Sequence, residues 1–297
     1  MTEFPAFDRS PEGRYFIKMH GLLNNFVIVD GRIKPYCPDA AEIVRVCDPK
    51  TGVGGDQLII IERPAKAGSN ATAFMRILNI DGREVEACGN ATRCVAWLLL
   101  EEAGVDQVTI ETLAGLLDCR RTGELEVSCE MGRVSTAWED IPLAAKTNTA
   151  HINFDGGAFS DGIALNIGNP HIVFFVSDID AIDIESFAPA IQENELFPDQ
   201  VNVGVAQVLS DGHLRSVVYE RGAGLTTACG SGACVAAFAA LARGLMQTRD
   251  ITVSMRAGDV RISISEDGVA TMTGPVAFCC SGYLQSDGSP AAAQGMP

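Results

Sequence analysis

A chain of 297 residues, 47% of them hydrophobic, can bury a core as one large domain or as two of ordinary size. Its formal net charge of −16, with no run of Lys and Arg, excludes binding to the phosphates of nucleic acids. No stretch is apolar for long enough to span a bilayer, and the N-terminus lacks the pattern of a signal peptide. We therefore expect a cytoplasmic protein with neither a nucleic-acid nor a membrane partner.

Short runs rich in β-branched and aromatic residues alternate with Gly, Asp and Asn turns along the chain. The runs predicted as strands are, in chain order, 26–29, 58–61, 74–78, 108–110, 163–166, 172–175, 205–208 and 214–218. Surface helices are predicted near 39–46 and 184–194. Residues 286–297 are expected to form a disordered tail.

Two further helices are predicted to be buried, and they share an unusual start. One follows Cys88 and ends at Gly104. The other follows Cys229 and ends at Gly244, and both have apolar residues at helical spacing. Each cysteine belongs to an Ala-Cys-Gly turn, and the two turns lie far apart in the chain. The sequence therefore predicts an internal repeat, in which Asn24 matches Asn169 and Gln57 matches Gln207.

The ten cysteines are expected to be reduced thiols in a cytoplasmic protein of this size. None forms a C-x-x-C pair and the chain has only four His, so no zinc ribbon, thioredoxin-like motif or other metal site is expected. A pyridoxal phosphate enzyme needs a Schiff-base lysine, but no lysine lies in a Gly- or Ser-rich phosphate-binding context. The TGVGGD loop also lacks the lysine of a P-loop. We therefore expect no cofactor and no metal.

A thiol at a helix start meets the positive end of the helix dipole and unpaired backbone N–H groups, and both favour the thiolate. Cys88 and Cys229 are therefore expected to have pKa values below the ordinary value of about 8.5. One thiolate can then act as a base while the other cysteine, still protonated, acts as an acid. Racemisation requires this pair, because one group removes an α-proton from one face and the other delivers a proton to the opposite face.

Other interpretations of these cysteines stay open at this point. Either one alone is most simply a buried core thiol, and the two together could form a regulatory disulfide. Cys94 and Cys234 lie one to two turns into the same helices and are predicted to be packing residues. The glycine after each Ala-Cys pair lets the backbone approach a ligand closely.

The segments that carry this chemistry resemble those of the diaminopimelate epimerases. The resemblance extends over roughly residues 17–284. The matching segments are KMHGLLNNFVIVD (18–30), DQL (56–58), RILNIDGREVEACGN (76–90), IGNPHIV (167–173), FPDQVNVG (197–204) and YERGAGLTTACGSGAC (219–234). The resemblance implies an α+β fold of two pseudo-symmetric halves, each a curved mixed β-sheet wrapped around a central α-helix. It implies that residues 1–133 form the half bearing Cys88, joined by a returning strand at 276–285, and that residues 134–275 form the half bearing Cys229.

The resemblance also implies an isomerase that interconverts L,L- and meso-diaminopimelate without pyridoxal phosphate, on the route to lysine and peptidoglycan precursors. Cys88 and Cys229 match the catalytic acid/base pair. The implied cradle for the substrate α-carboxylate is Gly89, Asn90, Gly230 and Ser231. The implied substrate-recognition residues are Asn24, Gln57, Asn79, Asn169, Asn202, Glu220 and Arg221.

Within this set, Arg221 can bind a distal carboxylate and Glu220 a distal ammonium group. Leu23 and Leu225 depart from the family pattern, in which Gly and Glu are frequent at those places. The expected partner is a small diamino-dicarboxylate substrate. The sequence leaves the oligomeric state open, with a homodimer as one option.

Two alternative functions remain. A proline or hydroxyproline racemase of the same fold would also use two cysteines, but its ring substrate has no second charged end for Glu220 and Arg221 to bind. A non-catalytic thiol redox sensor would instead join Cys88 and Cys229 in a disulfide and show no turnover under reductant.

Overall fold

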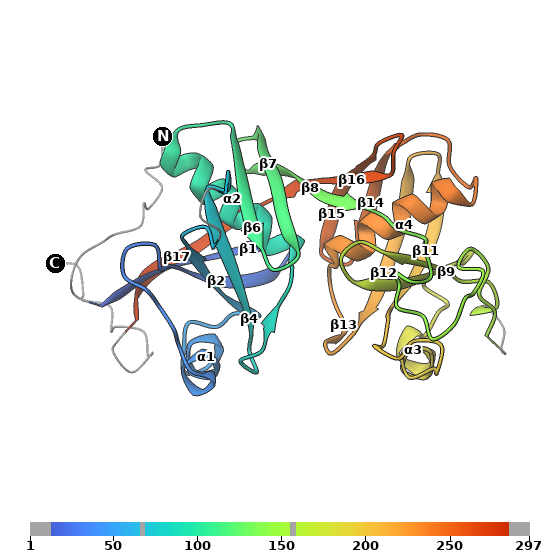
Figure 1. The fold of residues 1–297 in the computed structure, drawn as a ribbon, viewed down its shortest axis with the longest axis horizontal. Coiled ribbons are helices and arrows are strands. Elements are labelled where there is room, and N and C mark those ends of the chain that lie inside the picture. The colour runs from blue at the N-terminus through green and yellow to red at the C-terminus, as the bar shows by residue number, and fades with distance from the viewer. Residues whose placement is uncertain (1–12, 66–68, 155–158, 285–297) are drawn as a thin grey trace. The chain divides into compact units, whose positions relative to one another are not determined.

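The computed structural model describes residues 13–65, 69–154 and 159–284, so the tail expected at 286–297 lies outside the described residues. The chain divides into two compact units (Figure 1). The first ends at Val127 and resumes at Pro275, and the second runs from Ser128 to Gly274. The chain passes from the first unit to the second in β8 (Glu126–Arg133) and returns in β16 (Val269–Pro275).

The first unit is a mixed sheet with two helices. Its sheet has the order β17, β1, β2, β3, β4, β6, β7, and the two-residue β5 pairs with the end of β4. The pairs β2–β3 and β4–β6 are parallel and the others are antiparallel. The elements are β1 (Arg14–Gly21), β2 (Asn24–Asp30), α1 (Ala40–Cys47), β3 (Gln57–Glu62), β4 (Ala73–Asn79), β5 (Glu84–Val85), α2 (Gly89–Ala103), β6 (Gln107–Thr112), β7 (Gly115–Gly123) and β17 (Ala277–Leu284).

The second unit repeats this plan. Its sheet has the order β9, β10, β11, β12, β14, β15, β16, with the short β13 beside the end of β12. The parallel pairs are β10–β11 and β12–β14. The elements are β9 (Ile163–Asn166), β10 (Pro170–Phe175), α3 (Ile184–Gln192), β11 (Asn202–Ser210), β12 (His213–Glu220), β13 (Gly224–Leu225), α4 (Gly230–Ala242), β14 (Asp250–Met255) and β15 (Gly258–Ile264).

The predicted internal repeat is confirmed by this common pattern. In each unit a helix joins the first parallel pair of strands and a buried helix joins the second, as the crossover between parallel strands requires. The eight predicted strands all fall within observed strands, and the predicted surface helices correspond to α1 and α3.

One pairing expected within the repeat is wrong. Gln57 lies opposite Phe26 of β2, whereas the corresponding place in the second unit, opposite His171 of β10, is taken by Asn202. Gln207 lies farther along β11, where its amide binds the backbone of the segment that follows β10. The prediction paired the two glutamines by residue type, and a shared residue type does not reveal strand register.

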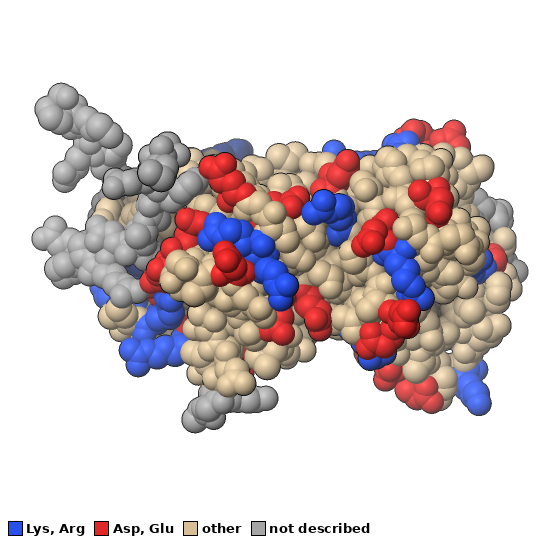
Figure 2. All heavy atoms as spheres, turned by 90° about the horizontal axis from the view of Figure 1, so that it is seen from above, with Lys and Arg blue, Asp and Glu red and all other residues tan. Residues whose placement is uncertain are grey.

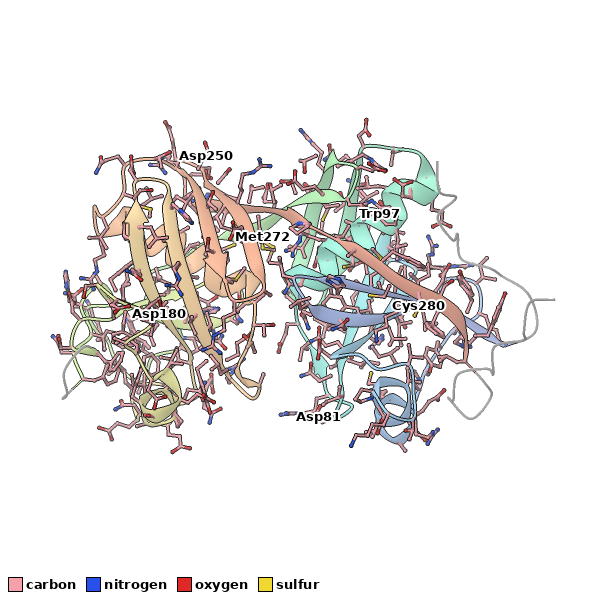
Figure 3. All side chains as sticks on the ribbon, turned by 180° about the vertical axis from the view of Figure 1, so that it is seen from behind. Asp81, Trp97, Asp180, Asp250, Met272 and Cys280 are labelled. Atoms are coloured by element: carbon pink, nitrogen blue, oxygen red, sulfur yellow. The ribbon has the colours of Figure 1, made fainter. Side chains whose placement is uncertain are left out.

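α2 is the central helix of the first unit and packs against β1, β2, β6 and β7. Its residues from Asn90 to Leu100 are all buried, as expected for a helix that is largely apolar on every side. Trp97, labelled in Figure 3, is 1% exposed and donates its indole N–H to the Glu124 carbonyl at 2.9 Å. The helix ends at Gly104, whose φ of 64° is the left-handed conformation that glycine tolerates.

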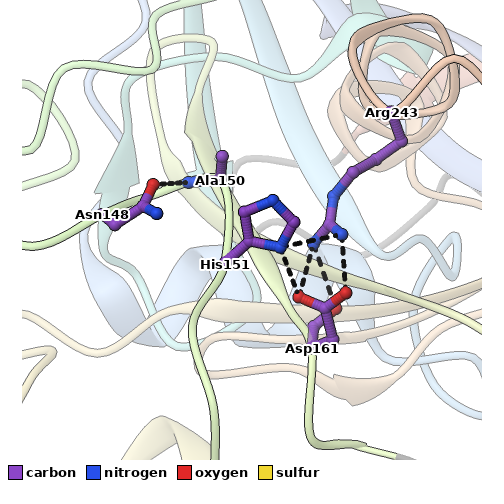
Figure 4. Close-up of polar contacts among 5 residues, drawn as sticks. All are labelled: Asn148, Ala150, His151, Asp161 and Arg243. Carbon is purple, nitrogen blue, oxygen red and sulfur yellow. Dashed lines mark hydrogen bonds and ion pairs between the residues drawn. The ribbon is translucent and has the colours of Figure 1, made fainter.

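α4 holds the matching place in the second unit, in contact with β9, β10, β11, β12, β14 and β15. Its sequence, GSGACVAAFAALA, is composed mainly of small residues, so the strands can approach it closely. The end of α4 is held by an ion pair, in which the Arg243 guanidinium meets the Asp161 carboxylate at 2.6 and 3.0 Å (Figure 4). His151 Nδ1 lies 2.9 Å from the same carboxylate. These contacts fasten the segment before β9 to the end of the helix that carries Cys229.

The described surface carries charges of both signs. Acidic and basic side chains are interspersed on the face shown in Figure 2. Of the helices within the described ranges, none has both the length and the apolar character needed to cross a membrane.

Candidate active site

Cys88 and Cys229 are the N-cap residues of α2 and α4. Both have extended backbones, with φ and ψ of −149° and 106° at Cys88 and of −122° and 110° at Cys229. Neither helix has an acidic residue in its first turn. The first N–H groups of each helix have no acceptor within the helix, so both cysteines stand beside the positive end of a helix dipole.

The half-buried Cys88 thiol faces two amide side chains. Its Sγ lies 3.8 Å from Asn24 Oδ1, and Asn90 Nδ2 lies 3.5 Å from the same oxygen. Thr92 Oγ1 donates to the Cys88 carbonyl at 2.9 Å, which holds the backbone at the helix start. The Cys88 site therefore combines the first turn of α2 with the start of β2.

Asn24 follows a strained two-residue turn. Leu22 and Leu23 have φ of 53° and 61°, so the β1–β2 hairpin has the positive φ values at both central positions that Asn and Gly usually provide. Each left-handed residue other than glycine costs about 1–2 kcal/mol. Leu23 is also 58% exposed. This departure from the family pattern leaves the hairpin register intact, because Gly21 still pairs with Asn24.

Gln57 and Asn79 form a second amide pair at the adjacent ends of β3 and β4. Gln57 Nε2 donates to Asn79 Oδ1 at 2.9 Å. Gln57 Oε1 is buried and accepts no hydrogen bond. Because a buried acceptor without a donor costs about 1–3 kcal/mol, a ligand N–H group bound there would be stabilised.

Cys229 is more deeply buried than Cys88, at 6% exposure. Its Sγ accepts the Gly232 N–H at 3.4 Å and lies 3.5 Å from Ser231 Oγ. Burial, and then the Glu220 carboxylate, raise the pKa of Cys229 well above its ordinary value. The expectation of a lowered pKa is therefore wrong for Cys229, because lost solvation and a nearby anion outweigh the hydrogen bonds from Ser231 and Gly232.

Glu220 ends β12 and is half-buried. Thr226 Oγ1 donates to its Oε1 at 2.5 Å. Burial raises the pKa of Glu220, while hydrogen bonds from Thr226 and Cys229 lower it. On balance the pKa of Glu220 is raised, with burial as the largest cause.

His171 is the site residue that sequence reasoning missed. It is 1% exposed, and its Nε2 lies 3.0 Å from Asn169 Oδ1, 3.1 Å from Ser231 Oγ and 3.4 Å from Asn202 Nδ2. Burial, and then the charge of Arg221, lower the pKa of His171 to about 3, so the imidazole is neutral. Its Nδ1 is buried and has no hydrogen-bond partner. The available signal was its place two residues after Asn169 in the IGNPHIV segment.

Asn202 links the His171 network to Arg221. It is 3% exposed, donates Nδ2 to the Pro170 carbonyl at 3.0 Å and accepts the Arg221 backbone N–H at 2.8 Å. The exposed Arg221 guanidinium donates to the Asp199 carbonyl at 2.8 Å. A neutral acceptor leaves the positive charge of Arg221 available to an anion.

The sequence-predicted site residues fall into two groups, one in each unit. The first group is Asn24, Gln57, Asn79, Cys88, Gly89 and Asn90, and the second is Asn169, Asn202, Glu220, Arg221, Cys229, Gly230 and Ser231. Each group contains a cysteine at the start of the central helix. Within the described residues, no three His, Cys, Asp or Glu side chains are arranged to hold a metal ion.

The sequence matches the protein family described as diaminopimelate epimerase over residues 16–137 and 163–279. It is 44% identical over 271 residues to the diaminopimelate epimerase of Rhodospirillum centenum, an alignment that covers 91% of this chain and 92% of the relative. It is 45% identical over 276 residues to that of Phenylobacterium zucineum, covering 92% and 98% of the two chains.

Solved structures of other proteins share the fold. A probable proline racemase from Agrobacterium radiobacter K84 superposes with a TM-score of 0.65 at 16% identity, covering 94% of this chain and 96% of that chain. A hydroxyproline epimerase from Agrobacterium vitis gives a TM-score of 0.63, also at 16% identity, with coverage of 92% and 93%. Identity this low shows a common fold alone. The common fold confirms the expected α+β architecture of mixed sheets around central helices.

Proposed function

This chain belongs to the diaminopimelate epimerase family, and on that premise we propose that it interconverts L,L- and meso-diaminopimelate with the thiols of Cys88 and Cys229. It is an isomerase, and its product lies on the route to lysine and peptidoglycan precursors. The observation that carries the proposal is the matched placement of the two cysteines, each at the N-cap of the buried helix of its unit. Inversion at carbon needs one base and one acid, and the repeat supplies an equivalent group for each task.

In the proposed reaction, one thiolate removes the α-proton of the substrate and the other thiol delivers a proton to the opposite face of the same carbon. The original C–H bond breaks, its electron pair is shared with the α-carboxylate, and the new C–H bond has the inverted configuration. The thiol and thiolate exchange roles, so the same pair serves the reverse reaction. Because burial and Glu220 raise the pKa of Cys229, Cys229 starts as the proton donor and Cys88 as the base.

The α-carboxylate is proposed to bind the N–H groups at the two helix starts, which belong to Gly89, Asn90, Gly230 and Ser231. Negative charge that develops on the carboxylate as the α-proton leaves would be stabilised by these fixed donors. Both the acid and the base are protein groups, so the proposed mechanism uses no cofactor and no metal.

The other end of the substrate is proposed to meet Arg221 through its carboxylate and Glu220 through its ammonium group. The negative charge of Glu220 has a second effect, since it raises the pKa of the Cys229 thiol and so favours the protonated form. Gln57 is proposed to accept a substrate N–H with its unsatisfied Oε1. The remaining amide contacts are assigned to Asn24, Asn79, Asn169 and Asn202.

We also propose a cytoplasmic location. The mechanism requires both catalytic thiols to stay reduced, and a reducing compartment maintains them in that state.

The decisive experiment is incubation of the enzyme with L,L-diaminopimelate in D₂O, followed by NMR of the α-position and chiral chromatography of the product. The inverted product should carry deuterium at the inverted carbon. Cys88→Ala and Cys229→Ala should each lose epimerisation. Cys94→Ala and Cys234→Ala are matched controls, because both thiols are fully buried in the same helices and should retain turnover. Turnover near that of the wild type in either catalytic variant would contradict the two-thiol mechanism.

The two alternatives are separated by two further assays. Inversion of L-proline at a rate comparable with diaminopimelate would favour a racemase, whose fold this chain shares. Absence of turnover under strong reductant, together with a disulfide between the two cysteines, would favour a redox sensor.

A further inference from the structure

Asp56, the residue before β3, is joined to the start of β2 by three hydrogen bonds. Its Oδ2 accepts the Asn25 backbone N–H at 2.7 Å and Asn24 Nδ2 at 3.2 Å. Its own N–H donates to the Asn25 carbonyl at 2.8 Å. None of the roles proposed above uses Asp56, although it contacts the side chain that faces Cys88.

The Asn24 amide bridges Asp56 and Cys88. Its Nδ2 meets the Asp56 carboxylate, and its Oδ1 lies 3.8 Å from Cys88 Sγ and 3.5 Å from Asn90 Nδ2. The two ends of a side-chain amide have nearly the same shape, so hydrogen-bond partners decide which way round it sits. An ionised carboxylate only accepts, and it therefore holds the NH₂ end of Asn24 toward Asp56 and the oxygen toward Cys88.

The reverse orientation of Asn24 would make two unfavourable contacts. Its oxygen would face the carboxylate of Asp56, and its NH₂ group would face the NH₂ group of Asn90. Cys88 would then meet a donor in place of an acceptor. Without the Asp56 carboxylate, the first of these penalties disappears and the preference for one orientation weakens.

The backbone of this hairpin also depends on Asp56. The turn residues Leu22 and Leu23 both occupy the left-handed region, which leucine disfavours, so the turn sequence itself does not hold Asn24 in place. The hydrogen bond from the Asn25 N–H to Asp56 fastens the first residues of β2 against relaxation of that turn.

We propose that Asp56 is a positioning residue for the Cys88 thiol. It orients the Asn24 amide so that the carbonyl oxygen, and not the NH₂ group, faces Cys88 Sγ at the start of α2. This oxygen gives the Cys88 thiolate no hydrogen bond that would weaken it as a base, and it accepts the S–H once Cys88 has taken the α-proton. The inference rests on the proposed role of Cys88 in proton transfer, and it assigns to Asp56 an effect on the proton-transfer step that is exerted through Asn24.

The test compares Asp56→Ala, Asp56→Asn and a control, Asp48→Ala, by steady-state epimerisation of L,L-diaminopimelate. Asp48 lies in the same loop and accepts the backbone N–H groups of Lys50 and Thr51, at 2.6 and 3.0 Å. Asp56→Ala should lower kcat about tenfold, and KM should rise by a smaller factor because Asn24 is also assigned a substrate contact, whereas Asp48→Ala should change neither. Asp56→Asn should recover most of the loss, because both donors reach one carboxylate oxygen that an amide oxygen can replace.

A double-mutant cycle tests whether Asp56 acts through Asn24. On an Asn24→Ala background, Asp56→Ala should cause less than about twofold further loss in kcat. The ¹⁵N-resolved side-chain amide signal of Asn24 should shift in Asp56→Ala and stay near its wild-type position in Asp48→Ala. If Asp56→Ala does not fold, Asp56→Ser takes its place, since serine keeps a polar side chain but lacks the carboxylate oxygen that both donors reach.

Three results would overturn the assignment. They are kcat in Asp56→Ala equal to that of Asp48→Ala, equal losses in Asp56→Asn and Asp56→Ala, and losses that multiply on the Asn24→Ala background. The second result would mean that the loss of kcat comes from removal of the Asp56 charge, and not from loss of its hydrogen bonds to Asn24 and Asn25. Failure of the proposed function is seen separately, as wild-type enzyme that incorporates no deuterium or as full turnover in Cys88→Ala.

Discussion

Gly232, in the first turn of α4, should tolerate no side chain, although alanine is the better helix former. A Cβ added there would lie 2.6 Å from Val218 Cγ2 and 3.3 Å from both Cβ and Sγ of Cys229. Val218 is 4% exposed, and its branched side chain has little freedom to rotate away. The new atom would therefore press on the core and on the catalytic sulfur together.

Magnitudes decide the sign of the Gly232→Ala effect. Alanine gains about 0.8–1 kcal/mol of helix propensity over glycine. Overpacking of a filled core costs about 1–3 kcal/mol. We expect Gly232→Ala to lower the free energy of unfolding by up to about 2 kcal/mol, and to lower kcat because Cys229 Sγ is displaced.

Truncating the Val218 side chain should relieve the overpacking caused by Gly232→Ala. Val218→Ala alone should cost roughly 2 kcal/mol, from two lost methyl groups and the cavity they leave. In the double variant the new Cβ enters that space and the helix propensity is gained, so the total cost should be about 1 kcal/mol. The double variant is then more stable than additivity predicts by about 1–3 kcal/mol.

The assay is urea unfolding of the full chain for the wild type, both single variants and the double variant, with kcat measured on the same samples. Additive effects on the free energy of unfolding would refute the packing explanation. So would a Gly232→Ala variant more stable than the wild type, because helix propensity would then outweigh the contact with Val218.

Arg221→Lys keeps the charge but loses the planar fork, so kcat/KM for diaminopimelate should fall about tenfold in initial-rate assays; unchanged kinetics would contradict a carboxylate-binding role. The pKa of His171 is lowered to about 3 in the folded protein, so as pH falls the unfolded chain binds a proton at this residue before the folded protein does. Its contribution to stability is complete above about pH 6.5 and is lost toward pH 3 at about 1.4 kcal/mol per pH unit. His171→Gln should flatten that part of the urea-midpoint curve, and an equally steep curve would count against this assignment. Asp161, whose pKa is lowered to about 2 chiefly by its hydrogen bond from Arg243, contributes stability above about pH 4 that is lost toward pH 2. Asp161→Asn should therefore cost about 1 kcal/mol or less at pH 7 in urea unfolding, with turnover unchanged, and a larger loss at pH 7 or a loss of turnover would contradict a purely stabilising role.

The strands and helices were predictable because their signals are local. The run Leu58–Ile61 is apolar and consists of one leucine and three β-branched isoleucines, and it forms the buried part of β3. The helix that follows Cys88 was predicted from its apolar spacing and from Gly104 at its end, and Gly104 is the C-cap of α2. Strand register is not local, so Gln207 was matched to Gln57 when Asn202 is the true counterpart.

The electrostatics of the predicted site residues differ from what the sequence suggested. The dipole at a helix start suggested a lowered pKa for Cys229, but the carboxylate of Glu220 and the surrounding core come from other segments of the chain and raise the pKa of the thiol. His171 lies just before the predicted strand 172–175, and only folding brings its Nε2 within hydrogen-bond distance of Asn169 and Ser231.

The sequence by itself determined the two Ala-Cys-Gly helix starts, the internal repeat and the family, because each depends on residues adjacent in the chain. Only the tertiary structure decided that the pKa of Cys229 is raised, that the pKa of His171 is lowered and that the Asn24 amide lies between Asp56 and Cys88. The physical reason is that burial and hydrogen-bond direction are set by groups far apart in sequence, which pairing of the strands brings within a few ångströms of one another.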